Sequence, residues 1–304
     1  MMIPDFAELC LMLFVMIDDH YRALPASLKP RGEQAGCSDS ELLTMLVVGE
    51  CMGWQRETEH VSYWARHRDL FPHQPDRTRL NRRRRALVVT LATLRGRVLA
   101  ALDLARDRQC VVDSLPVPVM GYHLVPGANN ANAWRSWGAD VGWIASKKQR
   151  LFGYRLHLLV TLGGVILDYV LAPASAHDVA VAPELLGGHD DLVVLGDKGY
   201  LSAPLAHALR EEQAVDLLTP PRRNALRPPP SGHVSLWNGL RQMVETVNAQ
   251  LTEQFEIGRH GAHTFGGLAA RLETKLTAHT LGIALNWQLG KAAWLQIKPL
   301  AFPI

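Results

Sequence analysis

Two aspartates follow short apolar stretches of the chain. Residues 110–112 lead directly to Asp113, and residues 192–195 lead through Gly196 to Asp197. A carboxylate at the end of a buried strand puts negative charge at a sheet edge, where ligands usually bind in α/β folds. One such aspartate is more often a turn residue or a helix cap. Two of them on neighbouring parallel strands would lie together, so Asp113 and Asp197 form a candidate pair.

A third carboxylate is predicted on a later helix. Apolar residues recur there at spacings of three and four and define a buried stripe, formed by Leu236, Leu240, Met243, Val247 and Leu251. A polar stripe lies roughly 100° around the helix and contains Arg241, Glu245, Asn248 and Thr252. Glu245 therefore sits beside the core, where it can lean over a sheet edge. Glu256 shares the polar side and remains a competitor, although the macrodipole disfavours negative charge near the helix end.

Three converging carboxylates repel one another unless a hard cation neutralises them. Mg²⁺ and Mn²⁺ suit such a site, because a few carboxylates hold them while waters and phosphate oxygens complete their ligand shell. Two such ions about 4 Å apart can activate a water or a 3′-hydroxyl and stabilise the leaving oxygen. The chemistry expected of Asp113, Asp197 and Glu245 is therefore phosphodiester hydrolysis and transesterification.

The elements that must position these residues include a clear hairpin. Strands are predicted at 154–162 and 165–171, because the Gly163-Gly164 pair between them supplies the positive φ of a primed turn. Beyond the hairpin, the pattern predicts short strands alternating with helices, at 179–186 (helix), 192–195 (strand), 205–212 (helix) and 215–218 (strand).

Other segments interrupt this pattern. Pro116 and Pro118 are expected to prevent regular strand pairing just after Asp113. Residues 121–150 are expected to be a loop-rich insertion. A connector rich in proline and arginine covers 220–230, and the chain is predicted to be helical from 235 to about 289.

Residues 1–105 are predicted to be helical and rich in arginine. Ser38 and Glu41 have the spacing of a capping box, which marks a helix start. Between Arg77 and Arg97 there are eight arginines and no acidic residue, and residues 82–85 are all arginine. Four consecutive arginines surround a helix axis, so some must face away from any core. Either they form a solvated face paired with acids elsewhere, or they contact nucleic-acid phosphates.

The composition is that of a soluble globular protein, with 48% hydrophobic and 20% charged residues in a chain of 304. Net charge is only +3, so DNA binding would depend on where the charge lies. The apolar segment 6–17 is too short to span a bilayer and lacks a basic n-region, which predicts a core helix in a cytoplasmic protein with no membrane partner. The four cysteines lack metal-site spacing and are expected to be buried hydrophobes.

Five short motifs occur in order along the chain, at 112–119 (VDSLPVPV), 146–149 (SKKQ), 152–154 (FGY), 196–200 (GDKGY) and 245–251 (ETVNAQL). Together they resemble the DDE transposases of bacterial insertion sequences, most closely the group called insertion-sequence family 982. Residues 38–43 and 77–85 are similar to the helical region of that group. The likeness covers about residue 35 to residue 290.

The resemblance implies an α/β fold with an RNase H-like mixed sheet as catalytic core, preceded by an all-helical N-terminal domain. Residues 1–105 would be the arginine-rich DNA-binding region and 106–304 the DDE catalytic domain. In that fold the first aspartate lies on the first strand, the second follows the fourth strand, and the glutamate lies on a later helix. Asp113, Asp197 and Glu245 match these positions and would hold two Mg²⁺ or Mn²⁺ ions.

Double-stranded DNA is the implied partner, as transposon terminal inverted repeats and as target DNA, bound by a homo-oligomer. The residues expected to contact it are basic: Arg77, Arg79, Arg82, Arg83, Arg84, Arg85, Lys147, Lys148, Lys198 and Arg241. Some related transposases carry Tyr, Arg and Lys around the glutamate; Arg241 fits, but Asn238 and Thr252 replace the other two. Lys148 and Lys198 could substitute as phosphate partners, and His157 is a further candidate contact.

Three functions remain open at this level. A transposase would cut DNA at specific terminal repeats and join the exposed 3′-hydroxyl to a target. A related RNase H-like nuclease would cut without joining. A non-catalytic DNA-binding relic of a transposase would do neither, although the presence of all three carboxylates disfavours it.

Overall fold

The computed structural model describes residues 5–32, 36–126, 129–144, 148–220 and 242–297. The chain divides into two compact units. One contains Met1–Leu104 and Gln250–Ile304 and is called the helical unit below. The other contains Ala105–Ala249 and is called the sheet unit. The C-terminal segment thus groups with the N-terminal helices, whereas sequence patterning assigned 106–304 to one domain; that functional division remains a proposal.

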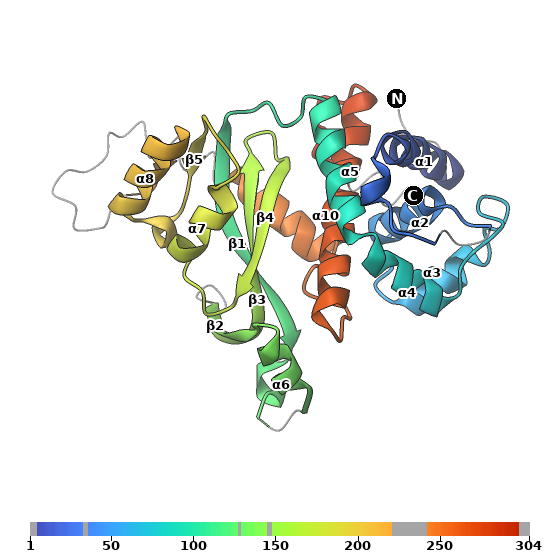
Figure 1. Ribbon diagram of the computed structural model, residues 1–304, viewed down its shortest axis with the longest axis horizontal. Helices are drawn as coiled ribbons and strands as arrows, with labels where there is room; N and C mark the ends of the chain where they lie inside the picture. The colour runs from blue at the N-terminus through green and yellow to red at the C-terminus, as the bar shows by residue number, and fades with distance from the viewer. Residues whose placement is uncertain (1–4, 33–35, 127–128, 145–147, 221–241, 298–304) are drawn as a thin grey trace. The chain divides into compact units, whose positions relative to one another are not determined.

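The sheet unit is built on six strands within its described residues, in the order β2-β3-β1-β5-β6, with β4 also paired to β3 (Figure 1). The strands are β1 (Gln109–Met120), β2 (Asp140–Ile144), β3 (Gln149–Thr161), β4 (Ile166–Pro173), β5 (Val193–Leu195) and β6 (Asp216–Leu218). Strand β3 pairs antiparallel with β1, β2 and β4, whereas β1–β5 and β5–β6 are parallel. This is an RNase H-like mixed sheet, and the expected fold class is confirmed.

The hairpin expected at 154–171 is present as β3 and β4, and Gly164 has a φ of +79° in its turn. Strand β3 begins earlier than expected, at Gln149, because its first residues pair with β2. Residues 121–150 were expected to be loop-rich, and this is wrong in part. They contain the short helix α6 (Asn129–Ser136), a 3₁₀ turn and strand β2.

The prolines after Asp113 do not interrupt β1, contrary to the sequence-based expectation. Pro116 lies opposite Arg155, and Pro118 lies opposite Gly153, in the antiparallel register with β3. The pairing of β1 with β5 covers only residues 109–111. Beyond it, β1 is paired along a single edge in the described part of the sheet, and a proline is tolerated where its missing N–H would point to an unpaired edge.

Two helices pack on one face of this sheet, α7 (Asp178–Leu186) and α8 (Ala203–Gln213) (Figure 1). They share one core cluster with the strands, in which Ala182 and Leu185 of α7 and Leu209 of α8 contact buried strand residues such as Val112 and Val194. Helix α7 connects β4 to β5, and α8 connects β5 to its parallel neighbour β6. The core therefore fixes the pairing of β1 with β5, and with it the positions of Asp113 within β1 and Asp197 just beyond β5.

The helical unit contains only helices and turns among its described residues, as expected for the N-terminal region. Its helices are α1 (Phe6–Arg22), α2 (Asp39–Cys51), α3 (Glu57–Trp64), α4 (Arg77–Ala86), α5 (Val88–Ala101) and α10 (Phe265–Gln288), with a 3₁₀ turn at Ala26–Leu28 and a π-turn at Gln250–Gln254. The capping box at Ser38 and Glu41 is confirmed. None of these helices is long and apolar enough to cross a membrane.

Helix α10 is the centre of the helical unit and is buried along most of its length. Its Lys275 donates to Glu50 of α2 at 2.6 Å, and both side chains are fully buried. Arg271 of α10 lies 3.7 Å from the other oxygen of Glu50 and 3.2 Å from Glu57. Burial disfavours each charge, but the two cations outweigh burial at Glu50 and hold the pKa of its carboxyl below its usual value. This ionic cluster fixes the register of α10 against α2 and α3.

Replacing Lys275 by Met should lower the free energy of unfolding by about 3–5 kcal/mol, because it leaves the buried Glu50 carboxylate without its closest cation. Chemical denaturation of the purified protein measures this. A double variant, Glu50→Leu with Lys275→Met, should recover most of the loss, since neither buried charge remains. A single variant as stable as wild type would show that the pair does not hold the helices.

Candidate active site

The register of two parallel strands sets the geometry of the site. Val111 of β1 lies opposite Leu195 of β5. Asp113 follows Val111 by two residues, and Asp197 follows Leu195 by two residues. The register therefore puts Asp113, in the middle of β1, level with Asp197, which lies two residues beyond the last residue of β5. The parallel pairing of these strands, expected from the sequence, is confirmed.

Both aspartates are half-buried and accept hydrogen bonds from neutral donors. Asp113 Oδ1 accepts from the backbone N–H of Ser114 at 2.8 Å, and Asp113 Oδ2 accepts from the side-chain amide of Asn248 at 2.8 Å. Asp197 Oδ1 accepts from the backbone N–H of Gly199 at 2.7 Å and caps the 3₁₀ turn Lys198–Tyr200. These donors orient the carboxylates while leaving their negative charge in place.

Asn248 brings a helix to Asp113. Residues 242–249 are helical, with Val244 and Val247 buried, and the chain continues into the π-turn Gln250–Gln254. Glu245 lies three residues before Asn248 on this helix and is exposed. Residues three apart share a helix face, so the face that carries Glu245 is the one turned toward Asp113. Arg241, on the same expected polar stripe, lies outside the described residues.

Glu256, the competing carboxylate, does not lie on this helix. It follows the π-turn, adopts a φ of +44° and pairs with Arg259 at 3.4 Å, within the helical unit. The expectation that it belongs to the same polar helix side is wrong, because the helix ends at Gln254.

A fourth carboxylate, Asp178, was not singled out from the sequence. It begins α7, and its Oδ1 accepts from the Ser114 hydroxyl at 3.3 Å and lies 3.9 Å from the Arg155 guanidinium. An aspartate at a helix start is ordinarily interpreted as a cap. Only the tertiary contact with Ser114, the residue after Asp113, reveals that Asp178 adjoins the site.

The three aspartates act on one buried phenol, Tyr200. Its side chain is 1% exposed, and its hydroxyl lies 3.2 Å from His157 Nδ1. Burial raises the pKa of Tyr200, and the charges of Asp178, Asp113 and Asp197 raise it further. The phenol therefore stays protonated.

His157, expected as a candidate phosphate contact, is fully buried behind the sheet edge. Burial lowers its pKa to about 4, and the neighbouring Arg155 charge acts in the same direction. A neutral, inaccessible imidazole cannot contact DNA, so that expectation is wrong. The histidine instead supports the Tyr200 hydroxyl.

Glycine at position 199 permits this crowding. A Cβ atom there would lie 2.2 Å from Asp178 Oδ2 and 2.8 Å from Asp197 Oδ1, both impossibly close. The two carboxylates can approach the backbone only because no side chain occupies the space between them. The Asp-Lys-Gly-Tyr motif at 197–200 therefore has glycine at 199 because the carboxylates of Asp178 and Asp197 lie close to the backbone there.

The family comparison agrees with this geometry. Residues 105–281 match the family model described as the transposase DDE domain, which is more than half of the chain. The chain belongs to the DDE transposase family. Searches of curated proteins and of solved structures gave no match. The matched segment includes all three proposed acidic residues of this DDE transposase, Asp113, Asp197 and Glu245.

Whether the site suits a divalent cation depends on its donors. Within the described ranges, no group of three or more His, Cys, Asp and Glu side chains is close enough to hold a metal ion. The available donors are nevertheless carboxylate oxygens, the ligands that Mg²⁺ and Mn²⁺ prefer. Asp113 and Asp197 accept hydrogen bonds from backbone and side-chain amide N–H groups, and carboxylates held in this way suit a hard cation.

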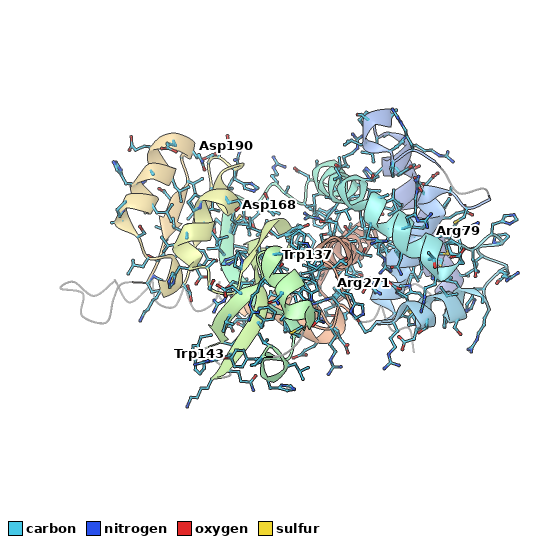
Figure 2. All side chains as sticks on the ribbon, turned by 60° about the horizontal axis from the view of Figure 1, so that its bottom comes forward. Arg79, Trp137, Trp143, Asp168, Asp190 and Arg271 are labelled. Carbon is cyan, nitrogen blue, oxygen red and sulfur yellow. The ribbon has the colours of Figure 1, made fainter. Side chains whose placement is uncertain are left out.

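The basic residues of the transposase fall into exposed and buried groups. On α4, Arg77, Arg79, Arg82 and Arg85 are exposed, and Arg79 is labelled on this helix in Figure 2. Arg83 is buried and donates to both oxygens of Asp39 at 2.6 Å, and Arg84 is also buried. Lys148 and Lys198 are exposed in the sheet unit, and Lys147 lies outside the described residues.

A groove of about 510 Å³ runs beside Asp178 in the sheet unit. Its lining includes Arg150 and Arg155 together with Trp143, whose side chain is 53% exposed and is labelled in Figure 2. Basic side chains with an exposed aromatic ring suit a nucleic-acid strand, because bases stack on the ring while the cations meet the phosphates.

Asn248→Leu removes the amide that donates to Asp113 at nearly the same side-chain volume. A hydrogen bond to a charged group contributes about 1.5–3 kcal/mol, so the DNA cleavage rate should fall at least about tenfold with DNA affinity unchanged. Thr246→Val, on the exposed side of the same helix, is the matched control. Equal cleavage rates for the two variants would show that Asn248 does not orient Asp113.

Proposed function

We propose that this DDE transposase moves a bacterial insertion sequence by cutting at its terminal inverted repeats and joining the exposed 3′-hydroxyl to target DNA. Asp113, Asp197 and Glu245 are the proposed catalytic and metal-binding residues. The observation that supports this is the β1–β5 register, which sets Asp113 of β1 level with Asp197 beyond the end of β5. The hydrogen bond from Asn248 supports the assignment of Glu245 over Glu256, because it turns the Glu245 helix face toward Asp113.

Each residue has a separate task in this proposal. Asp113, Asp197 and Glu245 hold Mg²⁺ or Mn²⁺, and two such ions, when bound, supply activation of a hydroxyl nucleophile and stabilisation of the leaving oxygen. Asn248 and the Ser114 N–H orient Asp113. Tyr200 stays protonated and adds no charge that would compete with the carboxylates.

DNA contact is proposed for two surfaces. In the helical unit, the exposed arginines of α4 would contact phosphates, while Arg83 supports that helix through Asp39. In the sheet unit, Lys198 follows Asp197 directly, and the groove beside Asp178 presents Arg155 and Trp143. Lys147, Lys148 and Arg241 complete the proposed set. The motifs further support membership of insertion-sequence family 982, a homo-oligomer assembled on DNA, and action in the cytoplasm.

The decisive experiment uses a labelled DNA that carries the element's own terminal repeat, with Mg²⁺ or Mn²⁺. Asp113→Asn, Asp197→Asn and Glu245→Gln should each lower cleavage and joining by at least about 10³-fold, because each removes a metal ligand. DNA binding should persist in all three. Glu256→Gln is the matched control and should retain activity. An active Glu245→Gln with an inactive Glu256→Gln would reverse the choice of the third carboxylate.

The same reaction separates the alternatives. A nuclease would release cut DNA without any strand-transfer product. A non-catalytic relic would bind the repeat and yield neither product, with equal affinity in wild type and the triad variants. Chelation of the divalent cation should stop both cutting and joining by the transposase.

Neutralising exposed arginines of α4 should weaken DNA binding, because fewer phosphates are then neutralised by the protein. For the triple variant Arg79→Gln, Arg82→Gln and Arg85→Gln, the salt slope of the binding constant should fall by about 0.9 for each phosphate that is no longer bound. Fluorescence anisotropy at several salt concentrations measures the slope. Arg97→Gln, an exposed arginine on α5, is the control. An unchanged slope in the triple variant would refute this surface.

A further inference from the structure

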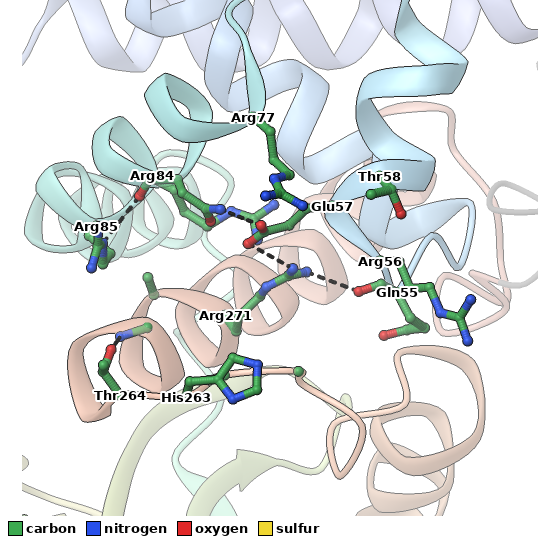
Figure 3. A pocket seen from close by; sticks show the side chains of 15 residues that line it. Gln55, Arg56, Glu57, Thr58, Arg77, Arg84, Arg85, His263, Thr264 and Arg271 are labelled. Atoms are coloured by element: carbon green, nitrogen blue, oxygen red, sulfur yellow. Dashed lines mark hydrogen bonds and ion pairs between the residues drawn. The ribbon is translucent and has the colours of Figure 1, made fainter.

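A second basic feature of the helical unit is a pocket that shares Arg77 and Arg85 with the exposed face of α4. This pocket of about 590 Å³ opens between α3, α4 and the start of α10 (Figure 3). Five arginines line it, namely Arg56, Arg77, Arg84, Arg85 and Arg271, against a single acidic residue, Glu57. The pocket combines N-terminal and C-terminal parts of the chain within one compact unit.

Arg84 is the unusual member of this lining. Its side chain is almost completely removed from solvent, the residue being 3% exposed, yet none of its three guanidinium nitrogens has a hydrogen-bond partner in the described part of the chain. Its neighbour Arg83 is buried to a similar degree but bonds Asp39 and two backbone carbonyls. A buried cation without partners is costly, so the Arg84 site is incomplete as it stands.

The charges around Arg84 do not balance. Three buried cations, Arg84, Arg271 and Lys275, share two carboxylates, Glu50 and Glu57. Lys275 and Arg271 occupy those carboxylates, which leaves the Arg84 charge in excess. Burial, and then repulsion from Arg271, lowers the pKa of Arg84 to about 10, so the guanidinium is still charged at neutral pH. The surplus positive charge faces the pocket (Figure 3).

The start of α10 adds to this surplus. Thr264 caps the helix by accepting from the Gly267 N–H, and both residues line the pocket. The N-terminus of a helix this long carries partial positive charge and unpaired N–H groups. Gly267 in this first turn lines the pocket and has no side chain to cover its backbone. Guanidinium and helix N-terminus together are the usual elements of a phosphate site.

We propose that this pocket binds an internucleotide phosphate of the DNA, with the Arg84 guanidinium and the first turn of α10 as its ligands and Arg77 and Arg85 at its rim. This rests on the proposed function, since it takes DNA as the partner. The pocket is much larger than a phosphate group and leaves space for the sugars on either side. One bound phosphate would supply the negative charge that the cluster of Glu50, Glu57, Arg271, Lys275 and Arg84 lacks.

The first test needs no DNA. Inorganic phosphate should raise the Tm of the full-length protein saturably, beyond the effect of chloride at equal ionic strength, because a ligand of the folded state stabilises it. Arg84→Met should abolish the phosphate-dependent rise while leaving the protein at least as stable without phosphate, because it removes a buried charge that has no partner. Arg84→Lys should keep part of the rise. Arg83→Met, the matched buried control, should lower the Tm but retain the rise.

The second test measures DNA affinity against salt concentration. Arg84→Met should reduce the salt slope by about 0.9, the value for one phosphate contact, whereas Arg97→Met on α5 should not change it. If Arg84→Met fails to fold, Arg77→Gln and Arg85→Gln on the exposed rim serve instead, and each should weaken the phosphate response of the Tm.

The outcomes are distinct. An Arg84→Met protein that loses stability but keeps the phosphate response and the salt slope would overturn the pocket and make Arg84 a structural residue. A phosphate response without any DNA binding by wild type would support the anion pocket and contradict the proposed function. If wild type binds DNA but shows no phosphate response, and Arg84→Met leaves the salt slope unchanged, the anion pocket is contradicted and the proposed function is supported.

Discussion

The parallel pairing of β1 with β5 sets Asp113 level with Asp197, and the surrounding structure supports this pairing. Helices α7 and α8 share a hydrophobic core with Val112 of β1 and Val194 of β5. If the register shifted by one residue, side chains would exchange faces of the sheet, and Asp113 and Asp197 would no longer be neighbours. The hydrophobic core of the sheet unit is thus what brings two like charges to one place.

Bringing carboxylates together costs free energy, and the site offsets it locally. Asp113 and Asp197 accept hydrogen bonds from backbone N–H groups and the Asn248 amide, while Asp178 faces Arg155. Neutral donors stabilise the negative charge without cancelling it, so the carboxylates remain available to a cation. The helical unit has the opposite condition, because its buried cluster holds a surplus of positive charge at Arg84. Each unit carries an unbalanced charge that its proposed ligand would neutralise: divalent cations in the sheet unit and a DNA phosphate in the helical unit.

Sequence patterning predicts the parts of this structure that depend on local periodicity. The hairpin of β3 and β4, the capping box of α2 and the apolar strand segments that lead to Asp113 and Asp197 follow from apolar runs and turn residues. Sequence patterning does not predict contacts between elements that are far apart in the chain. Asp178 looks like a helix cap until its contact with Ser114 is seen, and the prolines of β1 are tolerated because only one strand edge is paired there.

The arginines of α4 also show that sequence patterning cannot predict tertiary contacts, here for single residues. Arg83 and Arg84 are adjacent and both buried, but only the first has an acidic partner, Asp39, from another helix. Nothing in the run of four arginines distinguishes them. The grouping of 250–304 with the N-terminal helices is likewise set by α10, whose buried surface needs α2 and α5.

The central claim is that Asp113, Asp197 and Glu245 surround one cation site. Its most direct test is to replace Mg²⁺ by Fe²⁺ with ascorbate and to map where the resulting radicals cut the full-length protein. The account predicts backbone breaks near all three residues, suppressed by excess Mg²⁺ and abolished together in Asp197→Asn. Breaks near only one of the three, or breaks unchanged in Asp197→Asn, would contradict it.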